Sequence, residues 1–205
     1  TLPRLNTILN AKSKVDNHGR KRIECGVNHA DTIANITVKE QIIDTVNTNI
    51  DFKNDIKDII YKYSSIKNKV VELDLHESNY RKVLNLGHTI GHAVESYSII
   101  SKDMDKLKHG QAIAVGLITE LYISHKIHGF DYKELLSIKE ELLKHFNRVK
   151  FKDIDQKEIL KIMSYDKKNY DNTVKYVLLK SIGNPVVDQE VDNELFFKAF
   201  EFYND

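Results

Sequence analysis

The sequence predicts a mainly α-helical protein with one small β-hairpin near residues 173–187. Helix breakers are few, since the 205 residues include only two prolines and eight glycines, so helices can run with little interruption from about residue 37 to 170. Several segments also space their apolar side chains at the 3.6-residue period of a helix. By contrast, TVKYVLLKSIGNPVV (173–187) switches to β-branched and aromatic residues, which indicates two short strands around a turn.

The first predicted helices lie in the middle of the chain. Residues 51–71 place apolar side chains on one face, with lysines and aspartates on the other. The segment LDLHESNYRK (73–82) breaks this period and is expected to form a loop that leads into a helix from Arg81 to about Ser96. The next predicted helix, HGQAIAVGLITELYISHKI (109–127), is apolar nearly all round, so we expect it to be central and buried.

The ends of the chain differ in character. Two amphipathic helices are predicted around 132–146 and 155–164, and a final helix over 192–203. Residues 1–50 are polar, weakly periodic and rich in asparagine, so they are expected to form a divergent or poorly ordered N-terminal segment. The predicted organisation is this segment followed by one helical domain over 51–205.

Composition excludes several classes of function. Apolar residues make up 41% and charged residues 30% of the chain, and the formal charge is +1, which gives no electrostatic bias toward nucleic acid or membranes. A single cysteine, Cys25, excludes a disulfide framework and a cysteine-based zinc site, and fits a reducing, cytoplasmic compartment. No window reaches the roughly 18 apolar residues of a membrane span. We expect neither nucleic acid nor a membrane as a partner.

The stretch LNLGHTIGHAVE (84–95) carries the most informative pattern. His88 and His92 are four residues apart and would project from the same side of a helix. Each follows a glycine, Gly87 or Gly91, and glycines inside a helix cost about 1 kcal/mol each relative to alanine, which close packing or a ligand must offset. The histidines are either satisfied core or surface groups, or ligands of a divalent metal, for which neutral imidazole is a common donor. The glutamate that follows the first histidine in metalloprotease helices is missing, which argues against that class.

A third histidine, His109 in KHGQA, begins the apolar helix predicted over 109–127. Taken alone, it is an ordinary helix-boundary residue. Helix N-termini also carry positive potential and free N–H groups, which favour anionic ligands. His109 is therefore another candidate for a binding position.

Basic residues near the histidines form the next pattern: Lys67, Arg81 and the pair Lys167 and Lys168 in SYDKKNYDN. Each alone is typical of a solvated surface. Arg81 precedes Asn85 by four residues and His88 by seven, so we expect it to share their helix face. Metal-binding histidines with converging cations would suit a phosphorylated or carboxylated small molecule.

Taken together, these motifs match a known family. RKVLNLGHTIGHAVES, HGQAIAVGL and YDKKN followed by VKYVLLKSIGNPVV resemble 3-dehydroquinate synthase, of the sugar phosphate cyclase superfamily, and KNKVVELDLHESNYRK upstream fits the same pattern. The resemblance covers about residues 55–200. It implies the multi-helical C-terminal domain of the dehydroquinate synthase-like fold.

The resemblance also implies an activity. The family uses NAD and zinc (or cobalt) to convert 3-deoxy-arabino-heptulosonate 7-phosphate to 3-dehydroquinate with elimination of phosphate, a carbon–oxygen lyase reaction of the shikimate pathway that leads to chorismate and aromatic amino acids. The implied partner is a small-molecule sugar phosphate. The full-length enzyme is expected to be a cytoplasmic homodimer.

Site residues follow from the matched motifs. The resemblance implies that His88 and His109 are metal ligands and that His92 is a polar active-site residue beside the substrate. The residues implied to contact the carboxylate, hydroxyls or phosphate of the substrate are Lys67, Arg81, Asn85 and one of Lys167 or Lys168. With His92, the first three of these are the expected catalytic residues.

The N-terminal part departs from the family pattern. In the family, the third zinc ligand is a glutamate in a G-x-A-E-x-x-K motif that follows TLP. In this sequence TLP stands at residues 1–3, but that motif does not follow it. The sequence around Glu24 does not match the motif either. No glycine-rich nucleotide-binding pattern occurs, so we expect no cofactor-binding residue in this chain and NAD to be bound by a preceding N-terminal domain. The isolated chain is therefore expected to be inactive. The alternatives are another sugar phosphate cyclase, a glycerol dehydrogenase-like enzyme, or a non-catalytic helical remnant; Arg81 and the D-K-K segment favour an anionic substrate over glycerol.

Overall fold

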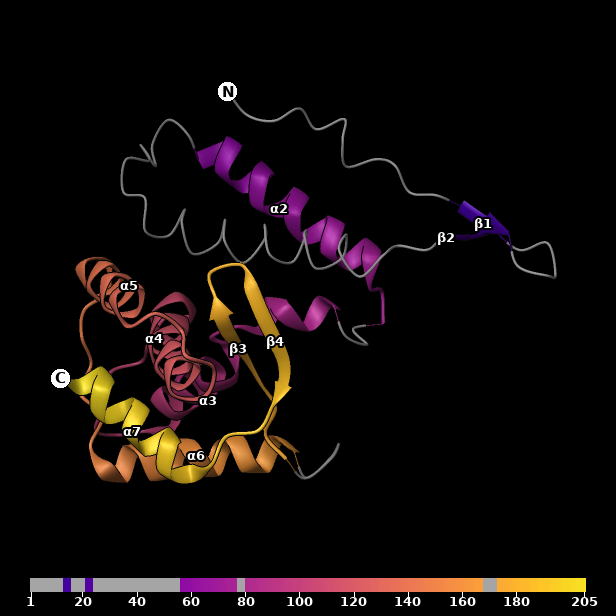
Figure 1. Ribbon diagram of the computed structural model, residues 1–205. Helices are drawn as coiled ribbons and strands as arrows, with labels where there is room; N and C mark the ends of the chain where they lie inside the picture. The colour runs from indigo at the N-terminus through magenta and orange to yellow at the C-terminus, as the bar shows by residue number, and fades with distance from the viewer. Residues whose placement is uncertain (1–12, 16–20, 24–55, 77–79, 168–172) are drawn as a thin grey trace.

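The computed structural model of the protein describes residues 13–15, 21–23, 56–76, 80–167 and 173–205. Its elements in chain order are β1 (Ser13–Val15), β2 (Lys21–Ile23), α2 (Ile56–Leu73), the 3₁₀ helix η2 (Tyr80–Asn85), α3 (His88–Ile100), α4 (His109–His128), α5 (Tyr132–His145), α6 (Asp153–Lys167), β3 (Tyr176–Ser181), β4 (Asn184–Gln189) and α7 (Asn193–Asn204). Helices α3 to α7 gather together, with the β3–β4 hairpin along one side (Figure 1). The predicted fold class, mainly helical with a small hairpin, is confirmed.

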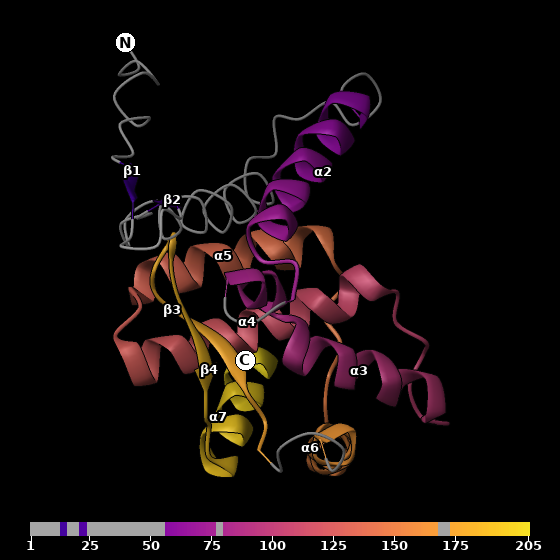
Figure 2. The same ribbon diagram turned by 90° about the vertical axis from the view of Figure 1, so that its right-hand side faces the viewer.

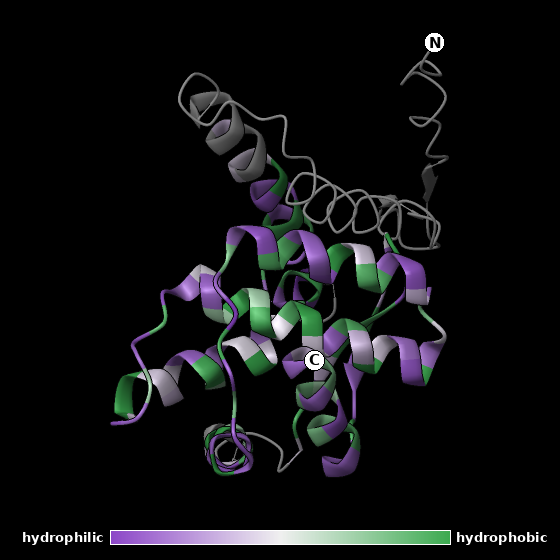
Figure 3. Ribbon diagram, turned by 90° about the vertical axis from the view of Figure 1, so that its left-hand side faces the viewer, coloured by the Kyte–Doolittle hydropathy of each residue, from purple (hydrophilic) through white to green (hydrophobic). Residues whose placement is uncertain are grey.

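Helix α4 lies at the centre of this arrangement, as its apolar sequence predicts. It contacts α3, α5, α7 and β3, and even its polar residues Thr119, Glu120 and Ser124 are fully buried. Ser124 Oγ accepts the backbone N–H of Leu179 at 3.0 Å, which ties α4 to strand β3. Along the surrounding helices, hydrophobic residues alternate with hydrophilic ones, as expected for helices with one buried face (Figure 3).

Glycines explain how closely α3 approaches α4. A Cβ atom added to Gly116 of α4 would lie 1.9 Å from the carbonyl oxygen of Gly87 and 2.8 Å from the nitrogen of Gly91. A Cβ atom on Gly91 would lie 3.1 Å from Cα of Ile113. Close packing against α4 is therefore one of the two expected reasons for a glycine beside a histidine that the structure shows, at Gly91.

The helix predicted from Arg81 to Ser96 is not continuous, and that prediction is wrong in its first part. The chain forms η2 up to Asn85, turns at Gly87 and begins α3 only at His88. Gly87 has φ 76°, a left-handed conformation that other residues rarely adopt and that ends the helical path. Arg81 and Asn85 therefore do not share an α-helical face with His88.

The remaining helices are confirmed as α2, α5, α6 and α7, with ends that differ from the predicted ones by a few residues. Two of them begin at aspartates that act as N-caps: Asp131 accepts the N–H of Glu134 at 2.9 Å, and Asp192 accepts the N–H of Leu195 at 2.7 Å. Figure 2 shows how α6 and α7 lie below α3 and α4. Within the described residues, no helix is long and apolar enough to cross a membrane.

The hairpin predicted near 173–187 is also confirmed. Strands β3 and β4 pair antiparallel, with Ser181 opposite Asn184 across a tight turn in which Gly183 has φ 82°. Of the segment 1–50, the structure describes an antiparallel pairing of β1 with β2. The other residues of that segment lie outside the described ones, so its expected divergent or poorly ordered character stays a prediction.

Candidate metal centre

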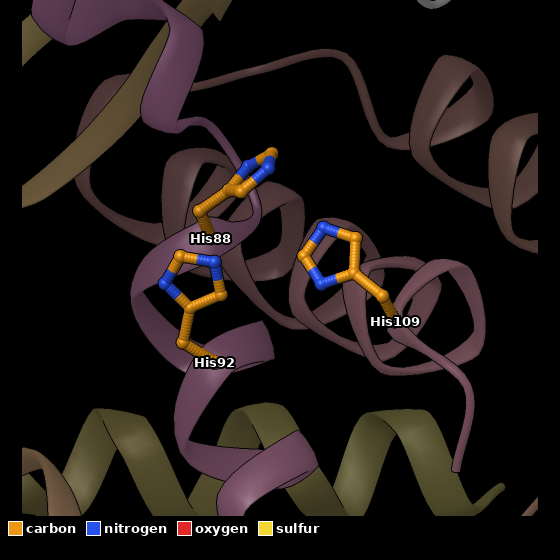
Figure 4. Close-up of side chains that lie close together, drawn as sticks. All are labelled: His88, His92 and His109. Atoms are coloured by element: carbon orange, nitrogen blue, oxygen red, sulfur yellow. The ribbon is translucent and has the colours of Figure 1, made fainter.

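Three histidines from two helices converge on one point. His88 is the first residue of α3, His92 follows one turn later, and His109 is the first residue of α4. Each offers a ring nitrogen, and these nitrogens all lie within 4.8 Å of one another. The ring centroids are 5.2 Å apart for His88 and His92, 5.7 Å for His88 and His109, and 5.6 Å for His92 and His109. Figure 4 shows the three rings turned toward a common space between the helices.

Two of the rings are oriented by protein acceptors. Nδ1 of His88 lies 3.0 Å from the carbonyl oxygen of Leu86, and Nδ1 of His109 lies 2.9 Å from Oε2 of Glu95. A carbonyl oxygen and a carboxylate can only accept, so each Nδ1 carries a proton, and in the neutral form of each ring Nε2 is the nitrogen with the lone pair. A histidine that donates from one nitrogen to a carbonyl or carboxylate is the usual form of a metal ligand.

The electrostatic environment also favours neutral imidazole at His88. Burial lowers the pKa of His88, and electrostatic interaction with His92, His109 and Lys67 lowers it further, against the opposing effect of the hydrogen bond to Leu86. A lowered pKa keeps the ring unprotonated near neutral pH, the form that binds metal ions. Zinc holds imidazole nitrogens at about 2.0 Å, which requires them roughly 3.3 Å apart, so modest ring movements would close the site. The donor set fits zinc.

A cavity of about 800 Å³ is lined in part by His88 and His92. Its polar lining includes Lys82, Asn85, His88, Thr89, His92 and Asp188. The Nζ atom of Lys82 lies 2.7 Å from Oδ2 of Asp188, so this pair joins η2 to β4 beside the cavity. The cavity therefore brings metal-binding groups, hydrogen-bonding groups and a cation together.

The other predicted substrate contacts are placed as follows. Asn85 lines the cavity, and Lys67, exposed on α2, is close enough to influence the pKa of His88. Arg81 is half-buried on η2, where its backbone N–H donates to Oδ2 of Asp74 at 3.0 Å, and it is not part of the cavity lining. Lys168 and the side chain of Lys167 lie outside the described residues.

Sequence reasoning missed two glutamates. Glu95 follows His92 by three residues and so shares its helix face, which was the available signal. Glu120 is a charged residue in the middle of an otherwise apolar helix, and its side chain is fully buried. A buried carboxyl group needs hydrogen-bond partners, so this position was detectable as one to explain.

The fold is similar to the folds of two solved synthases. It is similar to the structure of ValA, the 2-epi-5-epi-valiolone synthase of Streptomyces hygroscopicus subsp. jinggangensis 5008 with NAD⁺ and Zn²⁺ bound, at a TM-score of 0.61 and 13% identity over 85% of this chain and 50% of that one. It is also similar to 2-deoxy-scyllo-inosose synthase complexed with carbaglucose-6-phosphate, NAD⁺ and Co²⁺, at a TM-score of 0.59 and 19% identity over 85% of this chain and 53% of that one. At these identities the likeness concerns the fold alone.

Sequence comparison then defines the family. The family model described as 3-dehydroquinate synthase C-terminal matches residues 28–169, and the chain belongs to this family. It is 33% identical over 163 residues to the 3-dehydroquinate synthase of Parabacteroides distasonis, a match over 80% of this chain and 44% of that protein. It is 36% identical over 143 residues to that of Pyrococcus abyssi, over 70% of this chain and 40% of that protein. The matched region spans less than half the length of these curated relatives.

Proposed function

We propose that the chain supplies the metal-binding and substrate-binding helical part of a 3-dehydroquinate synthase, which converts 3-deoxy-arabino-heptulosonate 7-phosphate to 3-dehydroquinate with loss of phosphate. One observation carries this proposal: ring nitrogens of His88, His92 and His109 lie within 4.8 Å of one another, and His88 and His92 also line a cavity. The relatives at 33% and 36% identity are named 3-dehydroquinate synthases, whereas the other cyclases share only the fold. This difference favours the dehydroquinate reaction over a sibling cyclisation.

In this proposal His88 and His109 hold a zinc or cobalt ion. The two solved cyclases were determined with Zn²⁺ and with Co²⁺, which supports a divalent metal for the fold family. A bound divalent ion would polarise a substrate hydroxyl and make its oxidation easier. The hydrogen bonds of both rings support the assignment, because they leave Nε2 of each ring available.

The remaining residues hold the substrate. His92 lines the cavity next to the metal position, where it can exchange a proton with a substrate oxygen, and Asn85 can hydrogen-bond a hydroxyl. Lys67, Arg81 and one of Lys167 or Lys168 are proposed to bind the carboxylate or the departing phosphate as cations. NAD is proposed to be bound by a domain outside this chain, so the chain alone is expected to form no 3-dehydroquinate.

Cobalt titration of the purified chain tests the metal assignment, since Co²⁺ reports its coordination by visible absorption. His88→Ala and His109→Ala are expected to abolish the signal, while His145→Ala, which changes an exposed histidine on α5, leaves it intact. His92→Ala separates its two roles: retained affinity supports a substrate contact, and a loss as large as that of His88→Ala makes it a ligand. No cobalt binding by the unmodified chain contradicts the proposal and favours a helical remnant.

A further inference from the structure

Glu120 makes an unusual connection between the two helices that carry the histidines. Its side chain is fully buried on α4, and its two carboxyl oxygens accept backbone N–H groups from the start of α3. The N–H of Gly87 donates to Oε2 at 2.6 Å, and the N–H of Ile90 donates to Oε1 at 3.0 Å. These donors precede Glu120 by 33 and 30 residues in the chain.

These bonds replace a local helix cap. The first N–H groups of any α-helix lack partners within the helix and are usually satisfied by a side chain at the N-cap. The N-cap residue of α3 is Gly87, which has no side chain to supply this bond. Glu120 reaches the position because Gly116, one turn earlier on α4, lets the two backbones come together.

The position of His88 explains what this connection does. His88 is the first residue of α3 and stands between Gly87 and Ile90, the two residues whose N–H groups Glu120 holds. His109 begins α4, the helix that carries Glu120. One buried carboxyl group therefore fixes the backbone of one proposed ligand relative to the helix of the other.

We propose that Glu120 is a positioning residue of the metal centre, which sets the backbone of His88 against α4 so that its ring meets that of His109. The inference rests on the proposed metal-binding function. Burying a carboxyl group is costly when an apolar side chain could fill the same space. The geometry gives this group a task that an apolar residue cannot perform, because only an acceptor can hold both N–H groups.

Two substitutions separate positioning from simple support of the fold. Glu120→Met keeps an unbranched side chain of similar size but removes both acceptors, so the chain is expected to stay folded while its Co²⁺ affinity falls about tenfold, as for other residues that orient metal ligands. Glu120→Gln keeps one acceptor oxygen and is expected to lose less. Amide hydrogen exchange at Gly87 and Ile90 is expected to be faster in Glu120→Met.

The matched control is Ile118→Met, which places the same residue at another buried position of α4, about 160° around the helix from Glu120. It is expected to leave Co²⁺ affinity unchanged. The positioning role is wrong if Glu120→Met binds Co²⁺ as tightly as the unmodified chain, or if Ile118→Met weakens Co²⁺ binding as much as Glu120→Met does. Neither result would contradict the metal centre itself. Absence of Co²⁺ binding by the unmodified chain overturns the metal centre itself, and the positioning role with it.

Discussion

Replacing Gly116 by alanine tests the close approach of α3 to α4 most directly. The new Cβ atom would lie 1.9 Å from the carbonyl oxygen of Gly87, whereas ordinary van der Waals contact begins at 3.4 Å. The obstacles are backbone atoms, which cannot rotate away as a flexible side chain can. The two helices would have to separate by about 1.5 Å at this point, which would also move His88 away from His109.

The expected cost follows from two opposing effects. Inside a helix, alanine stabilises the folded state by about 1 kcal/mol relative to glycine. Overpacking of a tightly packed core destabilises it by typically about 1–3 kcal/mol, occasionally more. With so short a contact to backbone, we expect a net loss of about 2 kcal/mol in the free energy of unfolding. For a chain of this size that corresponds to a melting temperature lower by roughly 4–8 °C.

Thermal unfolding followed by circular dichroism measures this loss, and cobalt titration of the same samples measures the site. Gly110→Ala is the control on the same helix, because its Cβ would meet only Phe146 Cε1, at 3.8 Å, and is expected to be neutral or stabilising. Equal melting temperatures for Gly116→Ala and Gly110→Ala would refute the close-approach argument. Unchanged cobalt affinity in Gly116→Ala would refute the link between helix spacing and the metal centre.

Two further predictions concern the glutamates. Glu95→Gln removes the charge that orients His109 while keeping its shape, so Co²⁺ affinity is expected to fall by about tenfold with little change in melting temperature, and an unchanged affinity would contradict the orienting role. Burial raises the pKa of Glu120 from 4.5 to about 8, despite the opposing N–H donors. Burial also raises the pKa of Tyr176, and the charge of Glu120 contributes to that rise. Glu120 then holds its proton more tightly in the folded state than in the unfolded state. Its contribution to the free energy of unfolding is therefore full below pH 4.5 and is lost as the pH rises through about 8. Between pH 4.5 and about 8, the metal-free chain should therefore lose stability relative to Glu120→Gln, by at most about 1.4 kcal/mol per pH unit. Chemical denaturation at several pH values measures this, and a stability that depends on pH equally in both proteins would contradict the prediction.

Local patterns were sufficient for most of the fold. Helices α5 and α7 follow from apolar periodicity and from the aspartates Asp131 and Asp192 at their starts, where the side chain satisfies an otherwise unpaired N–H. The central position of α4 follows from its apolar surface, and the hairpin from its β-branched residues around Gly183. In each case the determining interaction lies within a few residues of sequence.

The metal centre could be predicted only in part for the same reason. The spacing of His88 and His92 indicates a shared helix face, but spacing says nothing of His109. The family resemblance gave His109 its role as a metal ligand, and the packing of α3 against α4 brings it within reach. The break at Gly87 was missed because a left-handed glycine interrupts a helix without disturbing its apolar pattern. Glu120 was missed because its partners stand 30 and 33 residues earlier.

The break at Gly87 also changes the energetics of the histidine motif. Inside a continuous helix, Gly87 and Gly91 would together cost about 2 kcal/mol relative to alanine. Gly87 instead stands at the N-cap with φ 76°, where alanine would be strained, so only Gly91 carries the cost of a helical glycine. That cost of about 1 kcal/mol is offset by the contact with α4, because a Cβ at Gly91 would lie 3.1 Å from Cα of Ile113 and 3.2 Å from the oxygen of Ala112. The two glycines of the motif thus have different tasks: one turns the chain so that α3 can begin at His88, and the other lets α4 approach closely enough for His109 to face it.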